Sequence, residues 1–240
     1  MPVIAIIDYD MGNLHSVCKG LEMTGSIPKV THDPKEIATA DGVVLPGVGA
    51  FDPAMRHLRS RQLISPILDV IASGKPFLGI CLGLHILFDG SEEGQESGLG
   101  VISGIVRRFM PEPGLTIPHM GWNQLQVSQP HLPVWKGLKP DSWVYFVHSY
   151  HGVPADVTLV TATTTHGSQQ VTAAIAYAGD PRQPTNQNLV AVQFHPEKSA
   201  HQGLQILSNF VNGSFYPQLP SPANPSENHH EPVDDEIDGE

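Results

Sequence analysis

The stretch Lys75-Pro-Phe-Leu-Gly-Ile-Cys81-Leu-Gly-Leu-His85 decides the fold of this chain. Its apolar run Phe77–Ile80 is short and continuous, as expected of a strand buried on both faces in a parallel sheet covered by helices. The run leads into a G-x-C-x-G pattern, and an apolar helical segment follows. This is the cysteine counterpart of the sharp strand-to-helix turn that lifts a nucleophile above an α/β sheet. The stretch therefore predicts an α/β fold with Cys81 at the edge of its sheet.

Apolar runs of the same kind recur at Val3–Ile7, Val43–Leu45 and Leu189–Phe194. Between the early runs, Asn13–Met23 and Leu63–Ile71 carry apolar residues at helical spacing. Strands that alternate with helices predict right-handed βαβ units. We therefore expect an open, mostly parallel sheet flanked by helices.

The middle of the chain has a different pattern. Four segments are rich in β-branched and aromatic residues, with no helical pattern between them: Val101–Phe109, Trp143–Tyr150, Leu159–Thr165 and Val171–Tyr177. They predict antiparallel strands added to the sheet in the second half of the chain. A final helix, Gly203–Val211, is expected to pack back on the sheet.

Composition predicts one domain, residues 1–214, and an acidic, Pro-rich disordered tail, residues 215–240. The tail from residue 217 onward holds seven of the 24 acidic residues, which leaves 17 acidic against 13 basic residues in the body. Such a balance argues against nucleic acid as a ligand. No run approaches the length of a membrane helix, the N-terminus lacks a signal-peptide pattern, and two cysteines are too few for a disulfide framework. We therefore expect a cytoplasmic protein that contacts no membrane.

Cys81 is the candidate nucleophile. The positive potential of a helix N-terminus favours the thiolate, which is the attacking species in thiol chemistry. Taken alone, the pattern is equally compatible with a small buried residue that fills a strand end.

A second signal supports the catalytic interpretation. In Leu189-Val-Ala-Val-Gln-Phe-His195-Pro-Glu197-Lys198, a histidine follows a buried strand and a carboxylate comes two residues later. A thiol nucleophile needs an imidazole base, and the base needs a group that orients it. In an extended segment the side chains of His195 and Glu197 point the same way, and Pro196 restricts the backbone between them.

A third strand end carries the loop Pro46-Gly-Val-Gly-Ala50. By itself this pattern predicts a turn. Beside the other two strand ends it becomes a candidate oxyanion hole, because the backbone N–H groups of glycine-rich loops can point at a developing negative charge.

These residues together resemble the class I, triad-type glutamine amidotransferase family. The match narrows to the glutaminase subunits of imidazole glycerol phosphate synthase and spans about residues 3–212. It rests on the following motifs, of which the third discriminates most: Ile7-Asp-Tyr-Asp-Met-Gly-Asn-Leu-His-Ser, Pro46-Gly-Val-Gly-Ala-Phe, Pro118-His-Met-Gly-Trp-Asn, Tyr145-Phe-Val-His-Ser-Tyr and Gln193-Phe-His-Pro-Glu-Lys-Ser.

The resemblance implies that a Cys81–His195–Glu197 triad hydrolyses L-glutamine to glutamate and ammonia. The ammonia would pass to a (β/α)8 cyclase subunit that makes imidazole glycerol phosphate and an aminoimidazole carboxamide ribotide in histidine biosynthesis. The positions that match the family's oxyanion hole through their backbone are Val48, Gly49 and Leu82. The positions that match its glutamine contacts are Gly47, Gly49, His85, Glu93, Ser149 and Tyr150. The positions that match its partner interface are Asn13, Trp122, Asn123 and Lys198.

Two residues depart from the family pattern. His85 stands where glutamine is usual, so an imidazole nitrogen has to replace an amide that contacts the substrate. Asp10 replaces a common glycine, and aspartate tolerates left-handed backbone better than most residues.

We expect neither a metal nor a cofactor. His148 and His151 are three residues apart on an expected strand and should point to opposite faces, and the chain has neither a dinucleotide-binding G-x-G-x-x-G nor a P-loop. Two alternatives remain open: a stand-alone hydrolase of the same fold, such as a γ-glutamyl hydrolase or peptidase, and a binding module that has lost catalysis.

Overall fold

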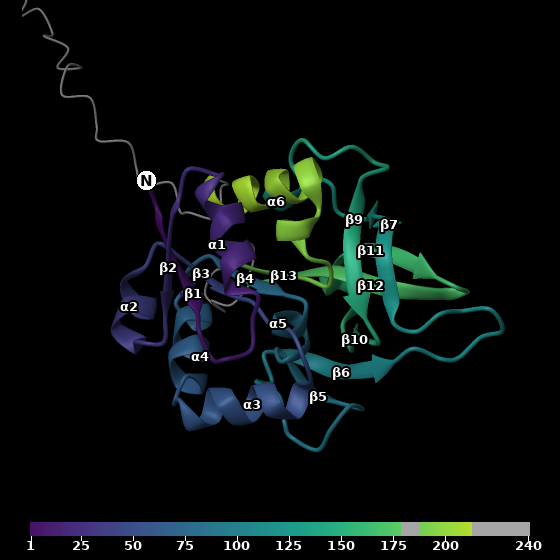
Figure 1. Ribbon diagram of the computed structural model, residues 1–240, viewed down its shortest axis with the longest axis horizontal. Helices are drawn as coiled ribbons and strands as arrows, with labels where there is room; N and C mark the ends of the chain where they lie inside the picture. The colour runs from purple at the N-terminus through teal and green to yellow at the C-terminus, as the bar shows by residue number, and fades with distance from the viewer. Residues whose placement is uncertain (179–187, 213–240) are drawn as a thin grey trace, which may run out of the picture.

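The computed structural model describes residues 1–178 and 188–212 (Figure 1). The tail predicted for residues 215–240 lies outside the described residues. Within them, no helix has both the length and the apolar character that a membrane crossing requires.

An eight-stranded sheet forms the centre of the molecule, in the order β2-β1-β3-β4-β13-β12-β11-β8. Its first five strands run parallel, and the last three are antiparallel to their neighbours. Their bounds are β1 Val3–Ile7, β2 Ile27–Thr31, β3 Gly42–Leu45, β4 Phe77–Ile80, β13 Leu189–Val192, β12 Gln169–Tyr177, β11 Val160–His166 and β8 Gln126–Val127. The predicted mostly parallel α/β sheet with antiparallel strands added late in the chain is therefore confirmed.

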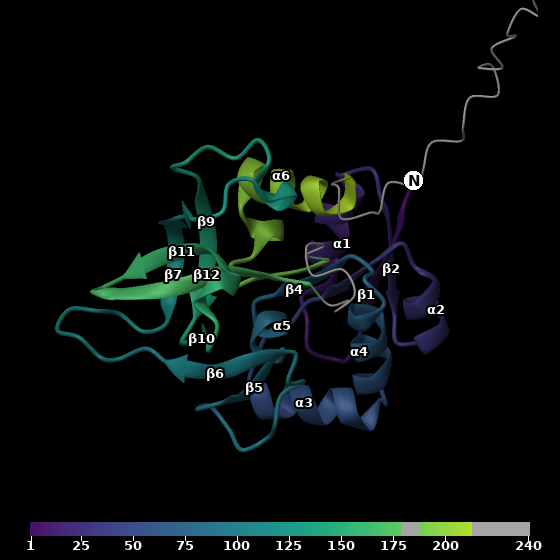
Figure 2. The same cartoon turned by 180° about the vertical axis from the view of Figure 1, so that it is seen from behind.

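Helices cover both faces of the parallel part (Figures 1 and 2). On one face, α1 (Leu14–Glu22) and α6 (Ala200–Asn212) share an apolar cluster with Ile4 and Ile6 of β1. On the other face, a second cluster joins Ala5 and Ile7 of β1 to four further helices. These are α2 Pro34–Thr39, α3 Phe51–Ser60, α4 Ile64–Ala72 and α5 Leu82–His85. Alternate residues of one strand thus supply two cores, which is why the strands are apolar at successive positions.

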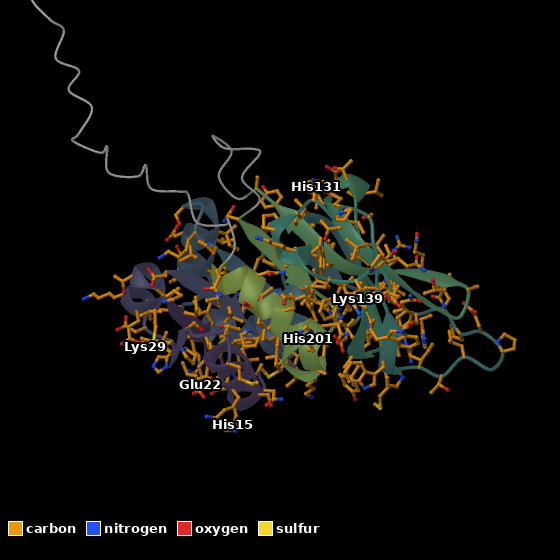
Figure 3. The ribbon with its side chains drawn as sticks, turned by 90° about the horizontal axis from the view of Figure 1, so that it is seen from above. His15, Glu22, Lys29, His131, Lys139 and His201 are labelled. Carbon is orange, nitrogen blue, oxygen red and sulfur yellow. The ribbon has the colours of Figure 1, made fainter. Side chains whose placement is uncertain are left out.

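Seen from the side of α1 and α6, polar side chains of the helix layer point outward, away from the sheet (Figure 3). His15 and Glu22 of α1 and His201 of α6 are labelled there, and all three are exposed. The inner faces of the same helices are apolar, with Val17, Leu21 and Ile206 fully buried. This helix layer is therefore amphipathic, as a layer that covers one face of a sheet must be.

The middle strands only partly join the central sheet, which corrects the sequence-based expectation. A three-stranded sheet in the order β10-β6-β5 and a two-stranded ribbon of β7 and β9 form separate units. Their bounds are β5 Phe88–Ser91, β6 Ile102–Arg108, β7 His119–Gln124, β9 Trp143–His148 and β10 Tyr150–Pro154. The predicted strand Trp143–Tyr150 is thus two strands interrupted at Ser149, since β9 pairs with β7 and β10 pairs with β6.

The predicted helices occur with small shifts at their ends. The final helix begins at Ala200 and not at Gly203, which lies inside it. A Cβ atom at Gly203 would lie 1.9 Å from the carbonyl oxygen of Pro196, so this glycine permits close backbone packing.

The turn between β4 and α5 is tight. Cys81 sits in this turn with φ of 54°, a left-handed value that is rare for residues with a side chain. Two residues later, a Cβ atom at Gly83 would lie 1.9 Å from the carbonyl oxygen of Leu45 at the end of β3. Only glycine allows the helix to pass the neighbouring strand this closely.

We predict that Gly83→Ala lowers the free energy of unfolding by about 3 kcal/mol, because the added methyl group overlaps backbone that cannot move aside. Urea denaturation of the purified chain measures this. The matched control is Gly90→Ala in β5, where a Cβ atom would lie 3.6 Å from the Ile105 side chain, an ordinary contact. Equal stability of the two variants would contradict the close-packing argument.

Candidate active site

Three predicted functional segments converge because their strands are neighbours. β3, β4 and β13 lie side by side and parallel, so the loops that follow them leave the same edge of the sheet. A cavity of about 410 Å³ opens there. It is lined by Val48, Gly49, Cys81, Leu82, His85, Glu93, Pro118, Val147, His148, Ser149, Tyr150 and His195. Such a volume suits a small-molecule ligand.

Cys81 lies at the floor of this cavity and is 7% exposed. Its N–H donates to the carbonyl oxygen of Val192 at 2.8 Å, which ties the turn after β4 to the end of β13. Leu82 is the first residue of α5, so its N–H has no partner within the helix. The thiol and the first helical N–H groups therefore face the same small space.

His195 and Glu197 form a buried pair beside Cys81. The Nδ1–H of His195 donates to Oε1 of Glu197 at 2.8 Å, and the two side chains are 2% and 1% exposed. Nε2 of His195 has no hydrogen-bond partner among the described residues, so it remains available for the thiol and a substrate. The segment after His195 is a 3-10 helix, Pro196–Lys198, and not the extended chain that the sequence predicted. The side chains still meet, because this tight turn brings the carboxylate back to the ring.

The electrostatics of this pair favour a charged imidazole. Burial lowers the pKa of His195, but the neighbouring Cys81 thiol and the Glu197 carboxylate outweigh burial and raise the pKa to about 10. A charged imidazole beside the Cys81 thiol can take part in proton transfer during nucleophilic attack.

The loop Pro46–Ala50 forms one wall of the cavity. Gly49 has φ of 107°, and the N–H of Val48 donates to the carbonyl oxygen of Met11 at 3.3 Å. Gly47 does not line the cavity, because it packs against the hydroxyl of Tyr9, where a Cβ atom would come within 2.4 Å. The structure therefore places Val48 and Gly49 at the cavity, with the Val48 N–H turned towards Met11.

His85 reaches Cys81 through a residue that the sequence analysis missed. Nε2 of His85 lies 2.8 Å from Oε1 of Gln193, and Nε2 of Gln193 donates to Sγ of Cys81 at 3.8 Å. Burial lowers the pKa of His85 to about 4, which outweighs the opposite effect of Gln193. His85 is therefore neutral, with its Nε2–H donated to Gln193. The available signal was a polar residue inside the apolar run Leu189–Phe194, where an amide needs buried partners.

The remaining predicted substrate contacts also line the cavity. Glu93 is half-buried, and its Oε2 accepts the N–H of Phe51 at 2.9 Å, so its carboxylate is anchored at the first turn of α3. Ser149 and Tyr150 form the junction between β9 and β10. Pro118, Val147 and His148 complete this wall and were not predicted.

All four predicted partner-facing residues are at least partly exposed, but Asn123 lies on the opposite side of its strand from Trp122. Trp122 is 48% exposed and packs edge-on against Tyr145, and Nζ of Lys198 lies 6.0 Å from the Tyr145 ring centroid. Asn13 is the partly exposed residue before α1. The amide of Asn123 points the other way and donates to the carbonyl oxygen of Thr165 at 2.8 Å. Successive residues of a strand face opposite sides, so Trp122 and Asn123 cannot share one surface.

The histidines near the cavity do not form a metal site. Within residues 1–178 and 188–212, no group of three or more His, Cys, Asp or Glu side chains is arranged to hold a metal ion. His148 and His151 do not point to opposite faces as predicted, since both rings pack on Phe109 with centroid distances of 5.2 Å. The reason is the strand interruption at Ser149, which changes the alternation of side chains.

Comparisons with known proteins identify the family of this chain. The family model for glutamine amidotransferase class-I matches residues 5–213. Imidazole glycerol phosphate synthase subunit HisH from a Cyanothece species is 66% identical over 219 residues, which are 91% of this chain and 100% of that protein. The proteins of the same name from Acaryochloris marina and Synechococcus elongatus are 64% and 62% identical. Those matches cover 88% and 91% of this chain and 94% and 96% of the two relatives.

Solved structures share the fold at low sequence identity. PurLQS from Thermotoga maritima matches with a TM-score of 0.67 at 18% identity, over 88% of this chain and 98% of that one. The glutaminase domain of Trypanosoma brucei CTPS with bound acivicin gives 0.57 at 16% identity, over 88% and 94%.

We predict that Glu197→Gln reduces the stability of the chain in a pH-dependent way. The folded-state pKa of His195, about 10, is above its ordinary 6.5, so the charged ring stabilises the fold fully below pH 6.5 and progressively less as pH rises towards 10. Removing the carboxylate lowers that pKa, so the loss of unfolding free energy should be largest at pH 6 and smallest near pH 10. Urea denaturation across this range measures it.

Glu36→Gln is the control, because Glu36 pairs with Lys29 at the surface and its pKa is lowered, chiefly by the Thr31 hydroxyl, so the stability it contributes is lost only at acidic pH and the loss in this variant should stay constant from pH 6 to 10. A loss in Glu197→Gln that stays constant from pH 6 to 10 would disprove the buried charged pair.

Proposed function

The chain belongs to the class I glutamine amidotransferase family and, within it, to the HisH subunits of imidazole glycerol phosphate synthase, and from that premise we propose that Cys81, His195 and Glu197 hydrolyse L-glutamine to L-glutamate and ammonia. Family membership assigns the chain the glutaminase activity of that enzyme in histidine biosynthesis. The observation that carries the residue assignment is the buried Glu197–His195 hydrogen bond beside Cys81, at the floor of a cavity of amino-acid size.

The chemistry follows from these positions. The thiolate of Cys81 attacks the side-chain carbonyl carbon of glutamine, and His195 gives its proton to the departing nitrogen. Ammonia leaves and a γ-glutamyl thioester remains. Neutral His195 then takes a proton from water, which attacks the thioester and releases glutamate, while Glu197 keeps the ring in its working orientation. The net reaction consumes one water and returns Cys81 to its starting state.

Backbone donors stabilise the oxyanion of each tetrahedral intermediate in this proposal. Leu82 and Gly49 border the space above Cys81, and Val48 supplies a third N–H once it turns away from Met11. One such donor is worth about 10²–10³ in rate. The hydrogen bond from Val48 to Met11 is therefore the resting arrangement, and glutaminase activity rises when this peptide rotates.

The cavity also offers groups suited to the amino-acid end of glutamine. The carboxylate of Glu93 is placed to pair with the α-ammonium group. The Ser149–Tyr150 backbone supplies the opposite wall, and the neutral imidazole of His85 offers Nδ1 as an acceptor. Gly47 lets Leu82 and Tyr9 approach the loop closely.

The chain acts within a two-subunit enzyme, and we propose a (β/α)8 cyclase as the subunit that receives the ammonia and makes imidazole glycerol phosphate and aminoimidazole carboxamide ribotide. The outer face of the β7–β9 ribbon supports this partner. It exposes Met120, Trp122 and Trp143 by 63%, 48% and 49%. The same face includes Val147, which lines the cavity, so a partner bound there would receive ammonia without its release to solvent.

Cys81→Ala tests the proposal, assayed in the complex with the cyclase. We expect glutamine-dependent product formation to fall by about 10³-fold or more, because the covalent route is lost. Synthesis from added ammonium salt should continue at the wild-type rate, because the cyclase is unchanged. The control is Cys18→Ala on α1, which should leave both rates unchanged. Glutamine-dependent synthesis that survives in Cys81→Ala would overturn the assignment, as would an equal loss of the ammonium-dependent rate.

A further inference from the structure

A cluster of aromatic rings lies behind the wall of the cavity, apart from His195 and His85. Phe109 is its centre and is 1% exposed. Four imidazoles pack on it with centroid distances of 5.0–6.3 Å: His119, His148, His151 and His166. Only His148 of these four also lines the cavity. The proposed chemistry uses none of them.

Hydrogen bonds connect two of these imidazoles into a chain that runs from β7 to the cavity. The amide Nδ2 of Asn123 lies 3.1 Å from Nε2 of His119. Nδ1 of His119 lies 3.3 Å from Nε2 of His148, and Nδ1 of His148 lies 2.8 Å from the carbonyl oxygen of Tyr150. His119 and His148 are directly opposite each other in the β7–β9 ribbon, so the strand register fixes their approach.

The donors and acceptors of this hydrogen-bond chain can be arranged in only one order. The carbonyl oxygen of Tyr150 can only accept, so Nδ1 of His148 carries its proton. Burial lowers the pKa of His148 well below its usual value and lowers that of His119 to about 4, so both rings are neutral and each has one donor and one acceptor. Nε2 of His148 therefore accepts from Nδ1–H of His119, whose Nε2 accepts from the amide of Asn123.

Asn123 has no freedom to reverse this order. Its Nδ2 also donates to the carbonyl oxygen of Thr165 at 2.8 Å, and its Oδ1 accepts the N–H of Gln124 at 2.8 Å. The side-chain amide is thus held at both ends, and its second N–H is directed at His119. The far end of the chain is anchored in the β7 and β11 backbone.

The end of the hydrogen-bond chain at the cavity holds the junction of β9 and β10. The carbonyl of Tyr150 is bound by His148, and the carbonyl of Ser149 accepts the N–H of Phe109 at 3.1 Å. These two bonds fix both peptide planes of the segment that lines the cavity. The junction lies where the pairing changes from β9 with β7 to β10 with β6, so the bond from His148 adds to the pairing of Tyr150 with Arg108.

We propose that Asn123, His119 and His148 are positioning residues that hold the Ser149–Tyr150 backbone as one wall of the glutamine site, an inference that rests on the proposed glutaminase function. His119 acts through His148 and does not touch the cavity. Loss of His119 should therefore weaken glutamine binding and leave the chemical step almost unchanged.

The test compares three variants of the full chain in complex with the cyclase. His119→Leu removes the hydrogen bonds to His148 and Asn123 and should raise KM for glutamine roughly fivefold, with kcat within about twofold. A fivefold change corresponds to about 1 kcal/mol, the value of one neutral hydrogen bond. His119→Asn places an amide N–H where Nδ1–H was and should recover most of the loss. His166→Gln is the matched control: it keeps a donor to the Thr116 carbonyl, 2.9 Å from Nε2 in the native chain, and removes the ring that stacks on His119 at 4.2 Å.

An independent readout needs no turnover. In ¹⁵N-histidine-labelled wild-type chain, His119 and His148 should both show protonated Nδ1 and bare Nε2 nitrogens at pH 7. Three results would each overturn the proposed hydrogen-bond chain. They are an unchanged KM in His119→Leu, an equal rise of KM in His166→Gln, and a protonated Nε2 on His148. If the wild-type complex uses no glutamine at all, the proposed function fails instead. The nitrogen signals then still decide whether the hydrogen-bond chain exists.

Discussion

The alignment of three parallel strands is the constraint on which the site depends. Residues of β3, β4 and β13 pair in a continuous register, with Leu45 opposite Gly79 and Val192 opposite Ile80. Their ends therefore reach one edge, and the chain must turn sharply into α5 to clear β3. The strained backbone of Cys81 and the contact of Gly83 with Leu45 follow from this geometry. The thiol is exposed to the cavity because its backbone cannot relax into either the strand or the helix.

Two histidines in one cavity have different charge states because their surroundings differ. His195 faces a carboxylate and a thiol, which raise its pKa to about 10, whereas His85 is fully buried against a neutral amide and has a pKa of about 4. The first ring is therefore a proton donor at neutral pH, and the second is a fixed hydrogen-bonding group. One cavity can thus combine proton transfer with neutral recognition, because Cys81 and Glu197 raise the pKa of His195 and burial lowers that of His85.

Local sequence patterns predicted the parts of the structure that local forces determine. The apolar strands, the turn at Cys81 and the left-handed Asp10, with φ of 67°, depend on residues close in sequence. The division of the middle strands could not be predicted, because the β7 residues that pair with β9 lie 19 to 29 residues earlier and pairing depends on the whole sheet. The hydrogen bonds of Asn123 with His119 and Thr165 likewise depend on how the strands pair. Gln193 was missed because its role depends on two side chains more than 100 residues away.

Covalent capture of the nucleophile tests the central claim most directly. A glutamine-mimicking electrophile added to the full chain with its cyclase should modify Cys81 stoichiometrically, as located by peptide mass spectrometry, with loss of glutamine-dependent activity. Cys18 provides the internal comparison, since burial raises the pKa of its half-buried thiol and keeps it protonated. Protection of Cys81 by excess glutamine would complete the expected result. Modification at Cys18 with an unmodified Cys81 and lost activity would contradict the account.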